Sequence, residues 1–136
     1  MNRYEARTLA FELLFQLTYT EPEEQSDLYD KERAERDFED DPYVREVVQG
    51  VSDHLAGLDE KIEENSSGWR ITRFSRVTLS ILRLSTYEML FREDIPYTVS
   101  INEAVELAKK YDDDKAPAFI NGILNAIADK AGLKTK

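Results

Sequence analysis

The sequence predicts an all-α protein with six or seven helices, and two observations support this fold class. Apolar residues in every long segment recur at intervals of three and four, which is the spacing of one helical face. No segment keeps up the alternation of apolar and polar residues that is typical of a half-buried strand. In addition, residues typical of helix starts stand before several of these segments, at Asp41-Pro42, Ser100 and Pro117.

The first two predicted segments differ in character. Residues 4–19 carry apolar residues on more than one face, which is typical of a helix in the centre of a fold. Residues 21–41 are a strongly acidic connection, and Leu28, Tyr29 and Phe38 could anchor a short helix over residues 26–38. Its charge density predicts that this connection is the most mobile part of the chain.

The middle of the chain begins with a strong helix start at Asp41-Pro42. An aspartate can accept a hydrogen bond from the first turn, and a proline suits the first helical position. The apolar stripe that follows runs from Val44 to Ile62, with a bend or split expected near Gly57. Residues 75–91 are the most apolar helix and are predicted to be the hub of the core.

The last third of the chain predicts two more helices joined by an acidic loop. Ser100 and Glu103 have the spacing of a capping box, so a helix is predicted to begin at Ser100. A second helix follows Pro117. The loop Asp112-Asp113-Asp114 lacks the alternating ligands and central glycine of a calcium loop, so capping of the next helix is the favoured interpretation.

Composition is consistent with a single cytoplasmic domain spanning residues 1–136. The chain has no cysteine, and no apolar run approaches the roughly 20 residues that a membrane helix needs. The net charge is −10, but residues 21–41 hold eleven acidic and three basic residues. The remaining chain is therefore nearly neutral, so a local basic patch for nucleic acid is not excluded.

No constellation of residues predicts catalysis or a bound cofactor or metal. A Gly-rich phosphate loop is absent, and the single histidine, His54, has no companion ligand, so a surface position is favoured. Arg70, Arg73 and Arg76 could form a basic strip, although arginine stems that cover apolar surface are the favoured interpretation. The residues alone therefore indicate a binding module.

Long motifs in the chain closely resemble the NusB transcription antitermination factors. The resemblance rests on Ile81-Leu82-Arg83 with Tyr87-Glu88, on residues 96–111 (PYTVSINEAVELAKKY) and on residues 119–124 (FINGIL). It implies two small helical bundles packed together and a role without enzymatic activity. It also implies binding of boxA RNA in ribosomal RNA leader transcripts together with ribosomal protein NusE. That complex would join NusA and NusG on RNA polymerase, and some members form homodimers that mask the RNA surface.

The resemblance further implies candidate site residues. The RNA-binding candidates are Arg3, Arg7, Lys115 and Phe119. The NusE-binding candidates are Phe15, Thr78, Arg83 and Glu88. Many relatives begin with more clustered arginines, and they often have tyrosine in place of Phe15 and an acid in place of Thr78. We therefore expect NusE to supply more of the RNA affinity here.

Two alternatives to this function stay open at the level of sequence. A similar helical domain begins ribosomal RNA cytosine methyltransferases, but only 12 residues follow Leu124, too few for a methyltransferase domain. The second alternative is a protein-interaction module without RNA binding, which fits the acidic charge and the few arginines near the N-terminus. It predicts NusE binding that boxA RNA does not affect.

Overall fold

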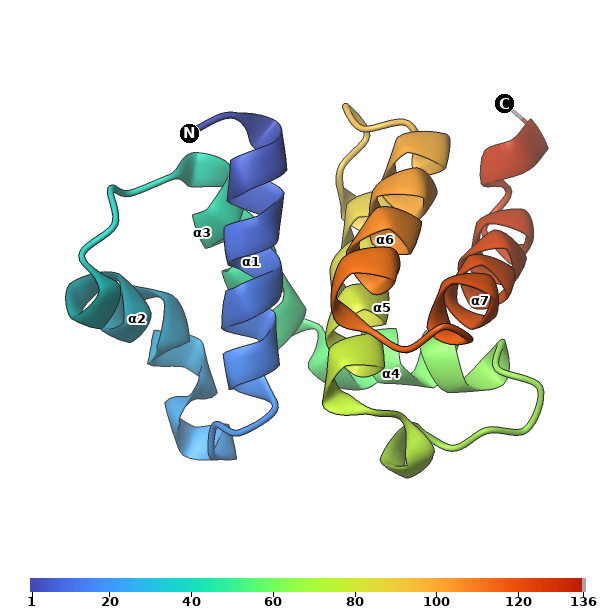
Figure 1. The fold of residues 1–136 in the computed structure, drawn as a ribbon, viewed down its shortest axis with the longest axis horizontal. Coiled ribbons are helices and arrows are strands. Elements are labelled where there is room, and N and C mark those ends of the chain that lie inside the picture. The colour runs from blue at the N-terminus through green and yellow to red at the C-terminus, as the bar shows by residue number, and fades with distance from the viewer. Residues whose placement is uncertain (136) are drawn as a thin grey trace.

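The computed structural model describes residues 1–135, and all the regular secondary structure in that part of the chain is helical (Figure 1). The α-helices are α1 (Arg3–Leu17), α2 (Leu28–Arg36), α3 (Pro42–Asp53), α4 (Leu55–Glu64), α5 (Arg76–Phe91), α6 (Tyr97–Tyr111) and α7 (Ala116–Lys130). Short 3-10 helices cover Pro22–Asp27, Ile71–Arg73 and Leu133–Thr135. The predicted all-α class with six or seven helices is confirmed, and none of the described helices is long and apolar enough to span a membrane.

The helices form two small bundles, as the sequence resemblance implied. Helices α1, α2 and α3 pack together at one side of Figure 1, while α4, α5, α6 and α7 pack together at the other. Helix α5 also contacts α1 and α3, so it joins the two bundles. The buried apolar side chains of both bundles form one continuous core.

Helix α5 is the hub of this core, as its composition predicted. Every residue from Thr78 to Met89 is buried, including the polar ones. A helix buried around its whole circumference needs partners for each polar side chain, because an unpaired polar group away from water is costly. The buried Thr86 hydroxyl has no hydrogen-bond partner among the described residues, whereas Glu88 has three, and these partners of Glu88 define the candidate site below.

Two local features of the first bundle fix where its helices begin. Asn2 accepts a hydrogen bond from the backbone N–H of Glu5 at 2.8 Å, and the Glu5 carboxylate accepts from the N–H of Asn2 at 3.1 Å. This capping box starts α1 at Arg3, and the spacing of Asn2 and Glu5 in the sequence is the local signal for it. Asp41 accepts from the N–H of Val44 at 3.0 Å, so the predicted start of α3 is confirmed.

The acidic connection is folded against α1 and α3. Leu28 and Tyr29 are buried, and the Tyr29 hydroxyl donates to Asp40 at 2.8 Å. Arg36 bridges Glu32 on its own helix and Glu12 on α1. The anchoring predicted for Leu28 and Tyr29 is confirmed, and the acidic charge is partly balanced by arginines within the same bundle.

The long stripe after Pro42 is split at His54 and not at Gly57. His54 has a φ of −115° and a ψ of 20°, so it ends α3 and precedes α4. Its ring is exposed, as predicted, and stacks on Phe91 with centroids 4.5 Å apart. A glycine was not required for the break, because this backbone conformation is open to any residue.

The predicted start of α6 at Ser100 is wrong. The helix begins at Tyr97, one turn earlier, after Pro96, which acts as the N-cap residue. Ser100 is only 1% exposed, and its hydroxyl donates to the Glu88 carboxylate at 2.8 Å instead of capping the backbone. Glu103 lies 3.9 Å from Arg7. Ser100 and Glu103 thus have the spacing of a capping box, but their side chains interact with Glu88 and Arg7 of other helices instead of with the backbone.

The acidic loop between α6 and α7 caps the second helix, as predicted. Asp113 accepts hydrogen bonds from the backbone N–H groups of Lys115 at 2.9 Å and Ala116 at 3.0 Å. Pro117 lies in the first turn of α7, where its missing N–H leaves no gap. Across residues 1–135, no group of three or more His, Asp or Glu side chains is placed to hold a metal ion.

Candidate functional site

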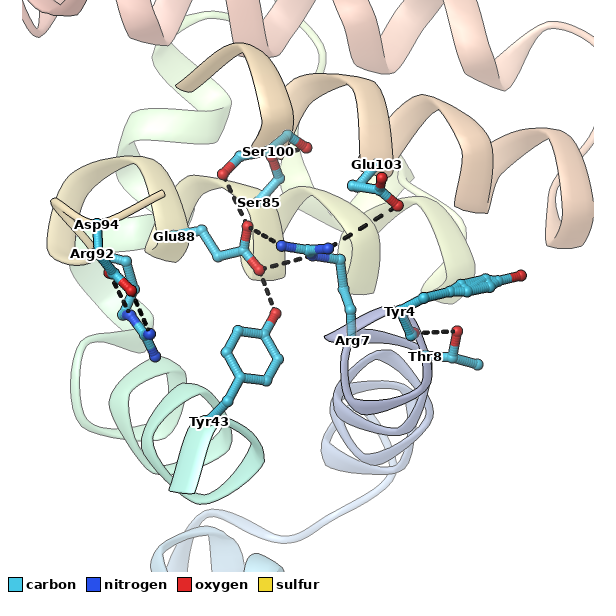
Figure 2. A network of polar contacts seen from close by, with 10 residues as sticks. All are labelled: Tyr4, Arg7, Thr8, Tyr43, Ser85, Glu88, Arg92, Asp94, Ser100 and Glu103. Carbon is cyan, nitrogen blue, oxygen red and sulfur yellow. Dashed lines mark hydrogen bonds and ion pairs between the residues drawn. The ribbon is translucent and has the colours of Figure 1, made fainter. Parts of the chain in front are cut away.

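A network of buried polar side chains lies where the two bundles meet (Figure 2). At its centre is Glu88 of α5, which is 1% exposed and accepts hydrogen bonds from three other helices. Arg7 of α1 donates through Nε at 2.9 Å and through Nη2 at 3.3 Å. Ser100 of α6 donates at 2.8 Å, and the Tyr43 hydroxyl of α3 also donates to this carboxylate. One side chain therefore ties four helices together.

The electrostatics of this network favour a charged pair between Arg7 and Glu88. Burial lowers the pKa of Arg7, but the hydrogen bond and negative charge of Glu88 outweigh it, so that the pKa rises above its ordinary value. Burial raises the pKa of the Tyr43 hydroxyl, and the charge of Glu88 raises it further. The Tyr43 hydroxyl therefore keeps its proton and donates it to the Glu88 carboxylate.

An arginine cluster covers the outer edge of the same network. The guanidinium groups of Arg3 and Arg92 lie 4.3 Å and 5.4 Å from the centre of the Tyr43 ring. Arg92 makes two hydrogen bonds to Asp94, and these lower the pKa of that carboxyl to about 2. Arg3 is exposed and makes no ion pair within 4.0 Å among the described residues.

The residues predicted to bind RNA do not lie in one place. Arg3 is near Asp94, just before α6 begins, whereas Lys115 and Phe119 follow the end of α6, 15 helical residues later. Lys115 is exposed and Phe119 is partly buried, and both line a groove that is also lined by Trp69. Arg7 is 6% exposed and is bound to Glu88.

Three of the four predicted partner residues are also buried in pairs within the chain. Arg83 makes a bidentate contact with Asp59, at 2.9 Å and 2.8 Å. Thr78 donates its hydroxyl to Asp112. Glu88 accepts the hydrogen bonds at the centre of the network described above. Of the four, only Phe15 is partly exposed.

Direct surface contacts by Arg7, Arg83 and Glu88 do not fit these positions. A guanidinium or carboxylate that is already paired in a buried site would have to break that pair before meeting a ligand, at a cost of several kcal/mol. The sequence could not reveal this, because Arg7 and Glu88 are 81 residues apart. In these positions Arg7, Arg83 and Glu88 stabilise the contacts between the helices that their ion pairs join.

Phe15 lies in a shallow apolar groove between α1 and α5. The groove is lined by Phe11, Glu12, Phe15, Gln16, Arg36, Val77 and Tyr111. The exposed ring of Tyr19 meets Phe15 edge-on with centroids 5.5 Å apart, and Arg76 lies 4.0 Å from the centre of the Tyr19 ring. Exposed aromatic rings beside an arginine are typical of protein-binding surfaces.

The fold and these surfaces define a class of protein, a two-bundle helical binding module with its charged pairs inside and its grooves outside. A sequence model of the NusB family matches residues 4–129. The chain belongs to the NusB family. The resemblance to the NusB family that the sequence motifs indicated is therefore confirmed.

Curated relatives and solved structures agree with this assignment. The chain is 44% identical over 127 residues to a protein of Clostridium novyi named "Transcription antitermination protein NusB", covering 91% of this chain and 96% of the relative. A relative of the same name from Ruminiclostridium cellulolyticum is 43% identical over 132 residues, covering 94% of this chain and 89% of its own. These relatives are antitermination proteins and not enzymes, so the protein is a transcription antitermination factor without catalytic activity.

The solved relatives share the whole fold. NusB of T. maritima superimposes with a TM-score of 0.81 at 33% identity, covering 96% of this chain and 92% of its own. A second structure, described as antitermination factors NusB and NusE in complex with dsRNA, has a TM-score of 0.78 at 28% identity and covers 96% of this chain and 99% of its own.

Proposed function

We propose that this antitermination factor binds boxA RNA of ribosomal RNA leader transcripts together with ribosomal protein NusE. The assembly would join NusA and NusG on RNA polymerase and would keep transcription of ribosomal RNA processive. The observation that carries this proposal is the match to a solved relative described as NusB and NusE in complex with dsRNA, with the same fold over 96% of this chain.

On the RNA side, the structure supports Arg3, Lys115 and Phe119 as contacts. Arg3 and Lys115 are exposed cations without ion-pair partners among the described residues, so they can meet phosphates without first breaking a salt bridge. The ring of Phe119 is partly exposed for contact with a base. Arg7 would act indirectly, because its pair with Glu88 fixes the first turns of α1 on which Arg3 stands.

On the protein side, the groove at Phe15 is the surface proposed for NusE. It is apolar, open and flanked by the exposed ring of Tyr19, so its burial by a partner would be favourable. Thr78 and Arg83 would support this surface from inside through Asp112 and Asp59. A Phe15→Ser substitution should therefore weaken NusE binding while leaving the core intact, because Phe15 is only partly buried.

The experiment that tests the proposal measures binding of labelled boxA RNA to the full chain, with and without NusE, at two salt concentrations. We expect tight binding only with NusE, and binding that weakens as salt rises, because phosphate contacts release counterions. Arg3→Gln should weaken RNA binding, whereas Arg33→Gln, at an exposed arginine on α2, serves as the matched control for charge. A sedimentation measurement beforehand establishes whether the protein is a monomer or a homodimer, because a homodimer of the kind that the family resemblance implies would mask the RNA surface. No RNA binding under either condition would contradict the proposal.

One observation favours a second candidate, a NusE-binding module without RNA binding. With Arg7 internal, Arg3 is the remaining exposed arginine at the start of α1, so the electrostatic attraction for RNA is small there. This candidate predicts that NusE binds with the same affinity whether or not boxA RNA is present. The binding experiment above distinguishes the two functions.

A further inference from the structure

The ends of α3 and α5 and the start of α4 meet at a hollow in the surface, termed the Phe91 hollow. It has a volume of about 300 Å³, and its lining residues include Asp53, His54, Ala56, Lys61, Leu90 and Phe91. Phe91 is the last residue of α5 and is 45% exposed, although residues 78–89 of the same helix are all buried. The hollow therefore exposes apolar surface that no described part of the chain covers.

The Phe91 hollow is separate from the groove proposed for NusE. Val77, in the first turn of α5, lines the groove at Phe15, whereas Phe91 ends the same helix about 21 Å away at 1.5 Å per residue. The residues that line the Phe91 hollow also include none of the candidates for contact with RNA, which are Arg3, Arg7, Lys115 and Phe119. An occupant of this hollow is thus compatible with NusE and RNA bound at the same time.

Stacked rings hold Phe91 in place. The rings of His54 and Phe91 stack with centroids 4.5 Å apart, and those of Tyr87 and Phe91 stack with centroids 4.9 Å apart. The Tyr87 hydroxyl donates to Glu46 at 3.1 Å, and its ring lies against Gly50, where a β-carbon would collide with it. Because Phe91 is fixed before a partner arrives, it loses little side-chain entropy on binding.

The side-chain charges around the Phe91 hollow favour a positively charged occupant. Asp53, Glu60 and Glu93 are exposed, and none of them lies within 4.0 Å of a cation in the described part of the chain. Asp53 lines the hollow, Glu93 follows Phe91 by two residues, and Glu60 is next to Lys61 on α4. Lys61 is the only lysine or arginine among the described lining residues. Carboxylates therefore outnumber cations at this surface.

The two helices that end at the hollow add partial negative charge. The last carbonyl groups of a helix have no partner within it, and they form the negative end of the helix dipole. Helix α3 ends at Asp53 and α5 at Phe91, and neither has a basic residue in its last turn. Arg92, which follows α5, is already paired with Glu46 and Asp94. A cation from a partner is therefore favoured at the ends of both helices.

We propose that the Phe91 hollow binds an apolar segment that carries lysine or arginine, and that this segment belongs to a protein component of the transcription complex. Leu90 and Phe91 bury its apolar side chains, while Asp53 and Glu93 pair with its cations. An apolar centre with a charged rim is the usual arrangement of a protein interface. The same carboxylates repel RNA phosphates, and a second copy of this chain would bring like charges together. The inference rests on the proposed function and adds a third contact surface to those for NusE and RNA.

The experiment measures binding of the labelled protein–NusE complex to an elongation complex of RNA polymerase, NusA and NusG that carries boxA RNA. Phe91→Ser removes the exposed ring and should weaken this binding roughly 10- to 30-fold, the range for a central interface residue. Ala56→Arg is a second variant, at an exposed position where added bulk and positive charge obstruct the hollow without disturbing the core. For both variants we expect unchanged affinity for NusE and for boxA RNA in the absence of polymerase, and thermal unfolding shows whether the fold is retained.

Two further substitutions test the sign of the partner's charge. Lys61→Glu should strengthen binding to the elongation complex about 2- to 5-fold, because it replaces a repelling cation by a carboxylate. Asp53→Asn should weaken binding by a similar factor while keeping an oxygen that can accept from Gln49. Lys31→Glu, at an exposed lysine of α2, is the matched control for the change in net charge. Raised salt should reduce the effects of Lys61→Glu and Asp53→Asn.

The outcomes separate this inference from the proposed function. Unchanged affinity for the elongation complex in Phe91→Ser and Ala56→Arg would overturn the inference and leave NusE and RNA binding in place. Weaker binding in Lys61→Glu would also overturn it, because the partner would then be acidic. A dimer that Ala56→Arg converts to a monomer would overturn it by identifying a second copy as the occupant. If the unsubstituted protein binds neither NusE nor boxA RNA, the proposed function and the inference are both contradicted.

Discussion

Replacement of Glu88 by glutamine should destabilise the protein more than almost any other single polar substitution. The change preserves the shape of the side chain but removes its negative charge and one of its two accepting oxygens. Arg7 would then be a buried guanidinium whose nearest remaining carboxylate is Glu103 at 3.9 Å, on a side chain that is 39% exposed. The hydroxyls of Tyr43 and Ser100 would then compete for the one accepting oxygen of the glutamine amide.

The magnitude follows from the burial of the pair. Arg7 and Glu88 have side chains that are 7% and 1% exposed, so solvent screens their interaction little. Removing one partner of a buried ion pair costs about 3–5 kcal/mol. That is a large share of the roughly 5–15 kcal/mol by which domains are stable, and it corresponds to a fall in Tm of about 10–20 °C for a chain of this size.

The assay is a double-mutant cycle read by urea unfolding. Arg7→Met and Glu88→Gln are made singly and together, and the free energy of unfolding is measured for each. In the double variant no charge is left buried, and the glutamine amide can still pair with Tyr43 and Ser100. We therefore expect the double variant to recover at least about 2 kcal/mol relative to the sum of the single losses.

Two results would refute this reasoning. One is a loss below about 1 kcal/mol in Glu88→Gln, a size typical of an exposed ion pair. The other is strict additivity in the cycle, which would mean that Arg7 and Glu88 do not interact. Lys109→Met is a suitable control, because Lys109 pairs with Glu106 while both side chains are more than half exposed, and it should cost little.

Three further predictions concern other parts of the same interface. Gly50→Ala should cost about 1–3 kcal/mol in urea unfolding, because a β-carbon there would collide with the buried Tyr87 ring; an unchanged midpoint would mean that the ring moves aside freely. Ser100→Ala should cost about 1.5–3 kcal/mol through loss of its bond to Glu88, and a loss near zero would show that the bond contributes nothing. Burial and then the bond to Glu46 raise the pKa of Tyr87 to about 12, above the value of about 10 for an unfolded chain. The unfolded state therefore loses this proton first, so stability should be fully present below about pH 10 and fall between about pH 10 and 12. Tyr87→Phe should flatten that fall, and an unaltered pH profile would contradict the shift.

The sequence by itself determined the fold class and most of the helices. The apolar spacing along α5 and α6 requires helices because only that geometry places all the apolar residues on buried faces. Asp41-Pro42 and Asp113 acted through the backbone within a few residues of themselves, so their effects could be predicted locally. The motifs that resemble NusB also lie within continuous stretches of the sequence, so the resemblance could be identified without the structure.

Only the tertiary structure decided which polar residues are free to bind. Arg7 and Arg3 differ little as sequence, yet one is buried against Glu88 and the other is exposed. Ser100 has the spacing of a capping residue, but its hydroxyl donates to the Glu88 carboxylate of α5 instead of capping the backbone. Hydrogen-bond and ion-pair partners from distant positions outweigh local preferences, because a buried charge must be paired wherever its partner lies in the chain.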